Sequence, residues 1–105
     1  MNEFLTVART DQVPEGTLKV FRVQGRRIAV SHVGGEFYAI DDLCTHDDGP
    51  LGEGSLKNDE VECPRHGARF NVRTGAATRM PAVTPVKIHL VRVDGPNVQV
   101  KLSDD

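Results

Sequence analysis

The sequence predicts an all-β protein, and three features support this fold class. Short segments alternate apolar and polar residues, which is the period-two pattern of a half-buried strand. Turn residues, chiefly glycine, proline, asparagine and aspartate, separate these segments at short intervals. No segment has a helical period of useful length. Short strands separated by regular turns favour an antiparallel sandwich or barrel.

The expected strands form two groups on either side of a middle region. Four strands are expected before that region and two after it: 4–8, 17–23, 27–33, 36–40, 86–93 and 98–102. The dipeptides Gln24-Gly25 and Gly34-Gly35 are short enough for hairpin turns. Residues 41–85 are rich in glycine and aspartate, and they separate the two groups of strands.

Length and charge limit the possible functions. A chain of 105 residues is expected to form one domain, residues 1–105, with a modest core. Its net charge of -2 gives no reason to expect nucleic-acid binding or attraction to an anionic membrane. No apolar run approaches the roughly 18 residues that span a bilayer, and the first residues do not resemble a signal peptide. A soluble, cytoplasmic protein is therefore expected.

Two cysteine and histidine pairs in the middle region form a candidate metal centre. Cys44 and His46 make the first pair, in C-T-H, and Cys63 and His66 make the second, in C-P-R-H. These are the only two cysteines, so using both as ligands leaves none for a disulfide. Two thiolates and two imidazoles from two short loops are a mixed ligand set for a metal centre.

Two kinds of metal centre fit these ligands. Two cysteines and two histidines also suit tetrahedral zinc, which therefore remains an alternative. Zinc sites usually group like ligands as C-x₂₋₄-C and H-x₃₋₅-H, whereas each loop here offers one ligand of each kind. Two mixed loops could instead hold a two-iron cluster from opposite sides, each loop giving its cysteine to one iron and its histidine to the other.

The two pairs and the residues around them resemble the Rieske iron–sulfur motif. The run from Cys63 to Gly75, C-P-x-H-G-x-x-F-x-x-x-T-G, is similar to the second cluster loop of small Rieske ferredoxins and of ring-hydroxylating oxygenases. Residues 80–86, M-P-A-V-T-P-V, resemble the proline-containing loop that covers the cluster in this family. The resemblance extends from Phe4 to Leu102.

The resemblance implies a fold, a cofactor and a function. The fold would be an antiparallel β-sandwich base with a small cluster-binding subdomain at about 41–85. The cofactor would be one [2Fe–2S] cluster held by Cys44, His46, Cys63 and His66. The protein would be a one-electron carrier and not itself an enzyme, passing electrons from a flavin reductase to a terminal oxygenase. The alternative is the Rieske-like small subunit of an NADH-dependent nitrite reductase.

The same resemblance implies a low reduction potential. High-potential members carry an extra cysteine in each cluster loop, and the matching positions here are Gly49 and Arg65. Those members also place a serine and a tyrosine whose hydroxyls donate to cluster sulfur. The matching positions here are Ala68 and Phe70, which have no hydroxyl.

Other polar residues are expected to play structural roles. His32 and His89 lie in alternating strand patterns and are expected to be partly exposed or hydrogen-bonded, not ligands. Asp41 and Asp42 are expected to form a solvated strand end. Gly67 could either make an ordinary turn or let a backbone N–H approach the cluster closely.

Overall fold

The computed structural model describes residues 3–43, 51, 54–64, 67–80 and 84–103. These residues form ten strands and one short 3₁₀ turn, Thr10–Gln12. Six strands are long and make the base: β1 (Leu5–Arg9), β2 (Leu18–Val23), β3 (Arg26–Val33), β4 (Glu36–Asp41), β9 (Ile88–Asp94) and β10 (Asn97–Lys101). Four strands of three residues each make the cap: β5 (Ser55–Lys57), β6 (Glu60–Glu62), β7 (Arg69–Asn71) and β8 (Ala77–Arg79).

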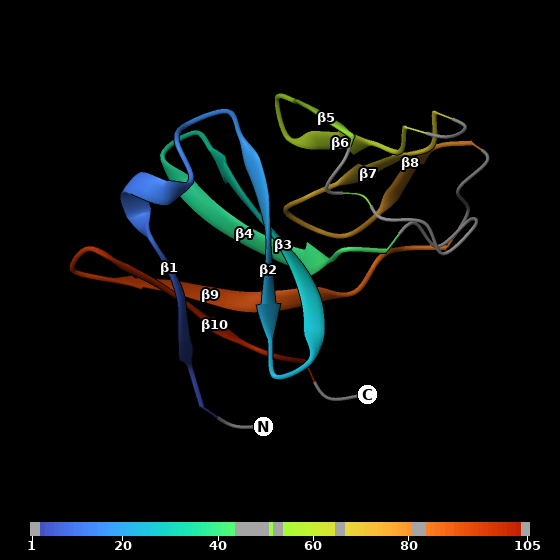
Figure 1. The fold of residues 1–105 in the computed structure, drawn as a ribbon. Helices are drawn as coiled ribbons and strands as arrows, with labels where there is room; N and C mark the ends of the chain where they lie inside the picture. Colours follow the sequence, from blue (N-terminus) through green and yellow to red (C-terminus); the bar gives the residue numbers. More distant parts are fainter. Residues whose placement is uncertain (1–2, 44–50, 52–53, 65–66, 81–83, 104–105) are drawn as a thin grey trace.

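The base is an antiparallel sheet in the order β1-β10-β9-β4-β3-β2, and the cap is a second sheet in the order β5-β6-β7-β8 (Figure 1). The pairing between β4 and β9 is short, joining Ala39 to His89 and Ile40 to Ile88. The base sheet bends there and folds back, so that β1 contacts β2 although they lie at opposite edges. The predicted all-β, antiparallel fold is confirmed.

The six strands expected on either side of the middle region are all present, with ends shifted by one or two residues. The hairpin between β2 and β3 turns at Gln24 and Gly25, whose φ angles are 51° and 81°. Two successive left-handed residues twist the chain in the sense that an antiparallel pair requires. The cap strands fall within residues 41–85, where no strand was expected. The boundary of that subdomain remains a prediction.

Strand β3 connects the two cores because both of its faces are buried. Ile28 and Val30 face the core inside the base, which also contains Val98 and Val100. Ala29 and Val33 face the second core, which lies between the base and the cap. Its other buried members are Ile40, Leu51, Val61, Cys63, Ala68, Phe70, Val72 and Val86. The cap thus packs on one face of the base through a continuous apolar layer.

Candidate metal centre

One of the four predicted ligands, Cys63, lies in the described part of the chain. Cys44, His46 and His66 lie outside the described residues, as do Gly49 and Arg65. Cys63 directly follows β6 and is 1% exposed. The core around it is apolar and contains Val61, Ala68 and Phe70. A thiolate is costly in such surroundings without a cation, so this cysteine fits a metal ligand better than an exposed nucleophile.

Two backbone hydrogen bonds close the loop between Cys63 and Ala68. The Cys63 N–H donates to the Ala68 carbonyl at 2.7 Å, and the Gly67 N–H donates to the Cys63 carbonyl at 3.1 Å. Gly67 has a φ of 78°, which glycine adopts without strain. Its N–H is therefore used within the turn. This favours an ordinary turn for Gly67 over an N–H that approaches the cluster. The closed loop fixes both ends of the segment that contains His66.

The described end of the first cysteine loop lies against the second. Leu51 is fully buried in the same core as Cys63. The Gly54 N–H donates to the Leu51 carbonyl at 2.9 Å, which makes a tight turn after the loop. A Cβ atom on Gly54 would overlap the carbonyl oxygen of Glu62, the residue before Cys63. Only glycine lets these two backbone segments approach this closely, so Gly54 helps to bring the two loops together.

The loop of residues 80–86 is anchored in a similar way. The Val86 N–H donates to the Gly75 carbonyl at 2.8 Å, and Val86 is buried in the core shared by base and cap. Gly75 has a φ of 81°, and a Cβ atom there would overlap the Val86 carbonyl oxygen. Residues 81–83 lie outside the described part of the chain, whereas Met80 is 71% exposed.

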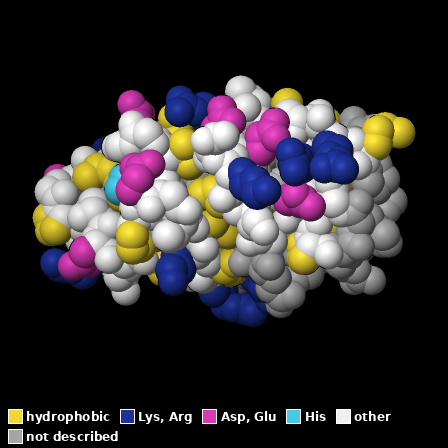
Figure 2. All heavy atoms as spheres, turned by 90° about the horizontal axis from the view of Figure 1, so that it is seen from above, with side chains coloured by type: hydrophobic (Ala, Val, Ile, Leu, Met, Phe, Trp, Pro, Cys, Tyr) yellow, Lys and Arg dark blue, Asp and Glu magenta, His cyan; other side chains and the backbone are white. Residues whose placement is uncertain are grey.

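Charged side chains on the cap pair with one another. Arg69 donates to Glu62 Oε1 from Nε at 3.2 Å and from Nη2 at 3.0 Å. Its Nη1 lies 3.8 Å from a carboxylate oxygen of Glu60. Figure 2 shows basic and acidic side chains close together to the right of the centre of the face that it presents. Because these groups are about one-third exposed, the pairs orient the β6–β7 hairpin more than they stabilise it.

The expectation that Asp41 and Asp42 form a solvated strand end is wrong. The side chain of Asp42 is fully buried and accepts hydrogen bonds from Arg27, whose Nη2 lies at 2.7 Å and Nε at 2.9 Å. Asp41 accepts from His89 and lies 3.4 Å from Nη2 of Arg26. Adjacent β3 supplies both arginines, which is why two carboxylates can be held at the end of β4. These pairs fix the strand from which the chain proceeds toward Cys44.

The two other histidines have the structural roles expected of them. His32 Nδ1 lies 2.8 Å from the Val13 carbonyl oxygen, and its ring stacks on Phe37. His89 is buried and hydrogen-bonded to Asp41 and Ser103. Burial lowers the pKa of His89, more than the Asp41 carboxylate raises it. Within the described residues, no three His, Cys, Asp or Glu side chains are placed to hold a metal ion.

Comparison with known proteins identifies the family. Residues 3–90 match the model of the Rieske [2Fe-2S] domain. The ferredoxin component of the naphthalene 1,2-dioxygenase/salicylate 5-hydroxylase systems of Ralstonia sp is 37% identical, over 94% of this chain and 95% of that protein. The ferredoxin component of biphenyl 2,3-dioxygenase from Rhodococcus jostii strain RHA1 is 40% identical, over 91% of this chain and 90% of that protein.

Solved structures separate the two functions considered for the chain. The ferredoxin in a complex of reduced oxygenase and oxidized ferredoxin of carbazole 1,9a-dioxygenase is 38% identical, with a TM-score of 0.87 over 95% of this chain and 97% of that one. A protein described as the small subunit of a putative NADPH nitrite reductase has a TM-score of 0.82, over 95% of this chain and 99% of that one, but only 16% identity. The second likeness shows the fold alone, so the nitrite reductase alternative is not favoured.

The ligand chemistry and the comparisons agree on the cofactor. Cys63 is buried where the Gly54 turn lies against the residue before it, which suits a cluster bound by two loops. The family match decides between the two candidate metal centres, because it indicates one [2Fe–2S] cluster and not zinc. The relatives that match over nearly their whole length are ferredoxin components, not catalytic subunits. The chain belongs to the Rieske [2Fe-2S] domain family, as an electron carrier of the ferredoxin type.

Proposed function

We propose that this chain is the ferredoxin component of a multicomponent ring-hydroxylating dioxygenase. It would receive electrons from a flavin-dependent reductase and deliver them singly to a terminal oxygenase. The observation that carries this proposal is the identity with dioxygenase ferredoxins over nearly the whole length of both chains. A ferredoxin of 38% identity is known in a complex with the oxygenase of carbazole 1,9a-dioxygenase, which supports an oxygenase as the electron acceptor.

We propose Cys44, His46, Cys63 and His66 as the ligands. Cys44 and Cys63 would hold one iron through thiolates, and His46 and His66 would hold the other through imidazole nitrogens. When bound, the cluster accepts and releases one electron. The neutral imidazoles add no negative charge to the site, so an electron enters more easily than it would with four thiolates. The buried position of Cys63 supports its assignment.

The remaining residues of the site would shape the path to the partners. The Cys63 to Ala68 loop and the Gly54 turn adjoin the proposed ligands in sequence, and exposed Met80, which follows the last cap strand, would be available to a partner. Within the described residues no helix is long and apolar enough to cross a membrane. We also propose a cytoplasmic location, with no nucleic acid or membrane as a partner.

Metal analysis tests the cofactor and the ligands together. The purified protein is expected to contain two irons and two acid-labile sulfides per chain, and its reduced form to give an EPR signal of low average g. Cys44→Ser and Cys63→Ser should abolish the cluster, and His46→Ala and His66→Ala should abolish or severely damage it. His32→Ala and His89→Ala are matched controls that should keep the visible spectrum. One tightly bound zinc, or loss of the cluster in a control, would contradict these assignments.

Electron transfer tests the partners. A flavin reductase of a naphthalene or biphenyl dioxygenase system, with NADH, should reduce the protein, and the matching oxygenase should reoxidise it. Single-turnover absorbance changes measure each step separately. Reduction without reoxidation by any ring-hydroxylating oxygenase, together with rapid reoxidation by a sirohaem nitrite reductase, would reverse the choice of acceptor.

A further inference from the structure

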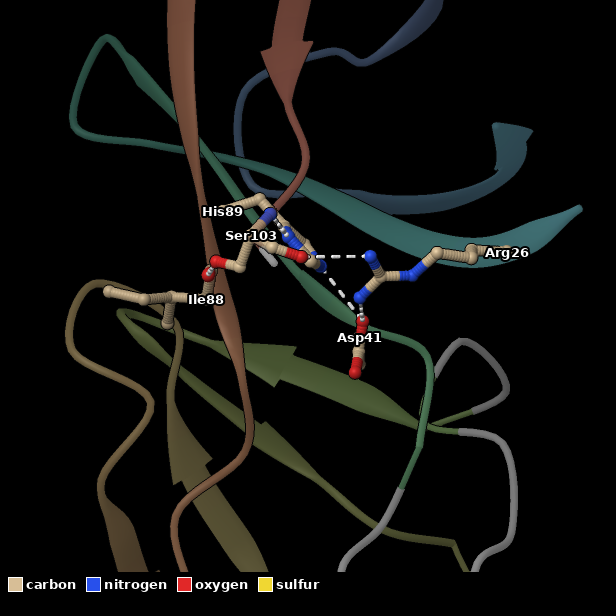
Figure 3. A network of polar contacts seen from close by, with 5 residues as sticks. All are labelled: Arg26, Asp41, Ile88, His89 and Ser103. Carbon is tan, nitrogen blue, oxygen red and sulfur yellow. Dashed lines mark hydrogen bonds and ion pairs between the residues drawn. The ribbon is translucent and has the colours of Figure 1, made fainter. Parts of the chain in front are cut away.

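Five residues from four parts of the base form one polar network, centred on His89 (Figure 3). His89 Nε2 lies 2.8 Å from Asp41 Oδ1, and the backbone N–H of Ser103 donates to His89 Nδ1 at 2.9 Å. Ser103 also donates from Oγ to the Ile88 carbonyl at 2.6 Å, and its own carbonyl accepts from Arg26 at 2.9 Å. The network therefore joins the C-terminal segment after β10 to strands β3, β4 and β9.

The network specifies the protonation state of His89. A backbone N–H can only donate, so the Nδ1 atom that faces the Ser103 N–H must carry a lone pair. The proton of the neutral ring is then on Nε2, where it is donated to the Asp41 carboxylate. The side chain of His89 is fully buried, so no water replaces either contact. The observed hydrogen bonds are those of a neutral imidazole in one tautomer.

Adding a proton to His89 would set two donors against each other. Nδ1–H of the imidazolium would face the N–H of Ser103, and one of the two groups would have to move. The Asp41 contact would survive, because Nε2–H remains a donor and gains an ion pair. Ser103 lies beyond the last strand, β10, which ends at Lys101. The C-terminal segment is therefore the part of the network that would move, while Ser103 still bonds to Ile88 and Arg26.

We propose that neutral His89 is a pH-sensitive latch for the C-terminal segment, Leu102 and Ser103. Protonation breaks the bond from the Ser103 N–H, so Leu102, which is 5% exposed in the base core, is held less tightly. The bonds of Ser103 to Ile88 and Arg26 remain. The latch makes no use of the proposed cluster ligands, so it stands or falls independently of the proposed function.

The charges around His89 set the pH at which the latch opens. Burial is the largest influence and lowers the pKa of His89 below 6.5, with smaller contributions from Arg26 on β3 and Lys87 before β9. Asp41 on β4 opposes them. Because the pKa of His89 is lower in the folded protein, its neutral form stabilises the closed state above pH 6.5. That stability is lost as the pH falls from 6.5 toward the pKa of the folded protein.

Amide hydrogen exchange in the wild-type protein tests the latch. The reference is the Thr10 amide, which donates to the Pro96 carbonyl at 2.8 Å in the same base. After correction for intrinsic rates, protection of Ser103 relative to Thr10 should fall as the pH decreases below 6.5, by up to about tenfold per pH unit. Long-range ¹H–¹⁵N spectra should show the Nε2–H tautomer at pH 8. Constant relative protection from pH 8 to 5, or the Nδ1–H tautomer, would overturn the proposal.

Three variants isolate the contact that titrates. His89→Asn keeps an oxygen acceptor that does not titrate, so protection of the Ser103 amide should no longer depend on pH. Ser103→Pro removes the N–H, and the pKa of His89 should then rise. Ser103→Ala keeps the N–H and loses only the bond from Oγ to Ile88, so the pKa of His89 should change little. Equal pKa values in the proline variant and the wild type would show that the N–H does not oppose protonation. If a variant does not fold, the wild-type titration still decides the question.

Discussion

The base and the cap are built in different ways, although both are antiparallel sheets. The base has strands of five to eight residues and a core of alternating apolar side chains. Each cap strand has only three residues. Strands this short pair few backbone groups, so the hydrogen bonds of the sheet alone cannot hold the cap in place.

The cap instead depends on close approaches between loops. The Gly54 turn lies against Glu62, and Gly75 lies against Val86. Its apolar layer includes Leu51 and Cys63, which flank the proposed ligand segments. Side-chain burial therefore holds both parts, and the cap depends in addition on close backbone contacts. Changes at the close approaches should damage the cap and leave the base folded.

The largest effect is expected from Gly54→Ala. The added Cβ overlaps the backbone carbonyl of Glu62, which cannot move without shifting Cys63. Overpacking of this kind costs about 1–3 kcal/mol, occasionally more. The purified variant should contain much less iron and show weaker visible absorption, while far-UV circular dichroism and the amide protection of β3 remain those of the wild type.

Gly16→Ala is the matched control for this substitution. A Cβ on Gly16 would meet no heavy atom within 4 Å, but the residue has a φ of 81°. The left-handed conformation costs an alanine about 1–2 kcal/mol, and here the cost is in the base. The melting temperature should fall without loss of iron from the folded protein. Equal iron contents in both variants would show that base and cap are not separable in this way.

The same difference explains what could be predicted from the sequence. Alternation predicted most of the base strands, because one buried face leaves a period-two pattern. The turns on either side predicted β3, which is buried on both faces. The three-residue cap strands are too short to show a period. The sequence shows Gly54 only as one glycine of a glycine-rich region. Its close approach could not be predicted, because it depends on a neighbour, Glu62, on strand β6. Asp41 and Asp42 were misinterpreted for the same reason: their partners Arg26 and Arg27 are on another strand.

A smaller effect is expected from hydroxyl groups introduced at two cap positions. Ala68 and Phe70 are fully buried in the core that contains Cys63, and the Rieske resemblance places hydroxyl donors there in high-potential members. A hydrogen bond to a charged group is worth roughly 1.5–3 kcal/mol, of which only the difference between redox states counts. A differential of about 1 kcal/mol corresponds to tens of millivolts, since roughly 59 mV equals about 1.4 kcal/mol for one electron.

Ala68→Ser and Phe70→Tyr should therefore each raise the reduction potential by tens of millivolts. The wild type should lie near the lower end of the Rieske range, at about -150 mV. Phe70→Tyr keeps the ring volume and so separates the hydroxyl from packing. Voltammetry of the three proteins is the measurement. A wild-type potential well above zero would contradict the low-potential prediction. Lower potentials in both variants with intact clusters would contradict its hydrogen-bond explanation.

The smallest effect is expected at Glu15, which holds a turn of the base. Its carboxylate accepts from the Gly34 N–H at 2.7 Å and from the Gly35 N–H at 2.9 Å, across the β3–β4 hairpin. These two hydrogen bonds lower the pKa of Glu15 below 4.5, and the bond from Gly35 has the larger effect. The ionised carboxylate therefore stabilises the fold above pH 4.5, and its contribution is lost as the pH falls through the lower pKa of the folded protein.

Glu15→Gln removes the charge but keeps one oxygen acceptor. The variant should be slightly less stable than the wild type to urea at pH 7, and the difference should shrink as the pH falls below 4.5, where the wild-type carboxyl also becomes neutral. Glu36→Gln, at an exposed position beside the same turn, is the control and should show no such convergence. Because both hydrogen bonds of Glu15 lie within the base, the visible spectrum at pH 7 should not change. Glu15 also borders a cavity that Leu56 and Asp59 of the cap line. A loss of visible absorption at pH 7 would therefore show that the Glu15 turn stabilises the cluster loops through the cap.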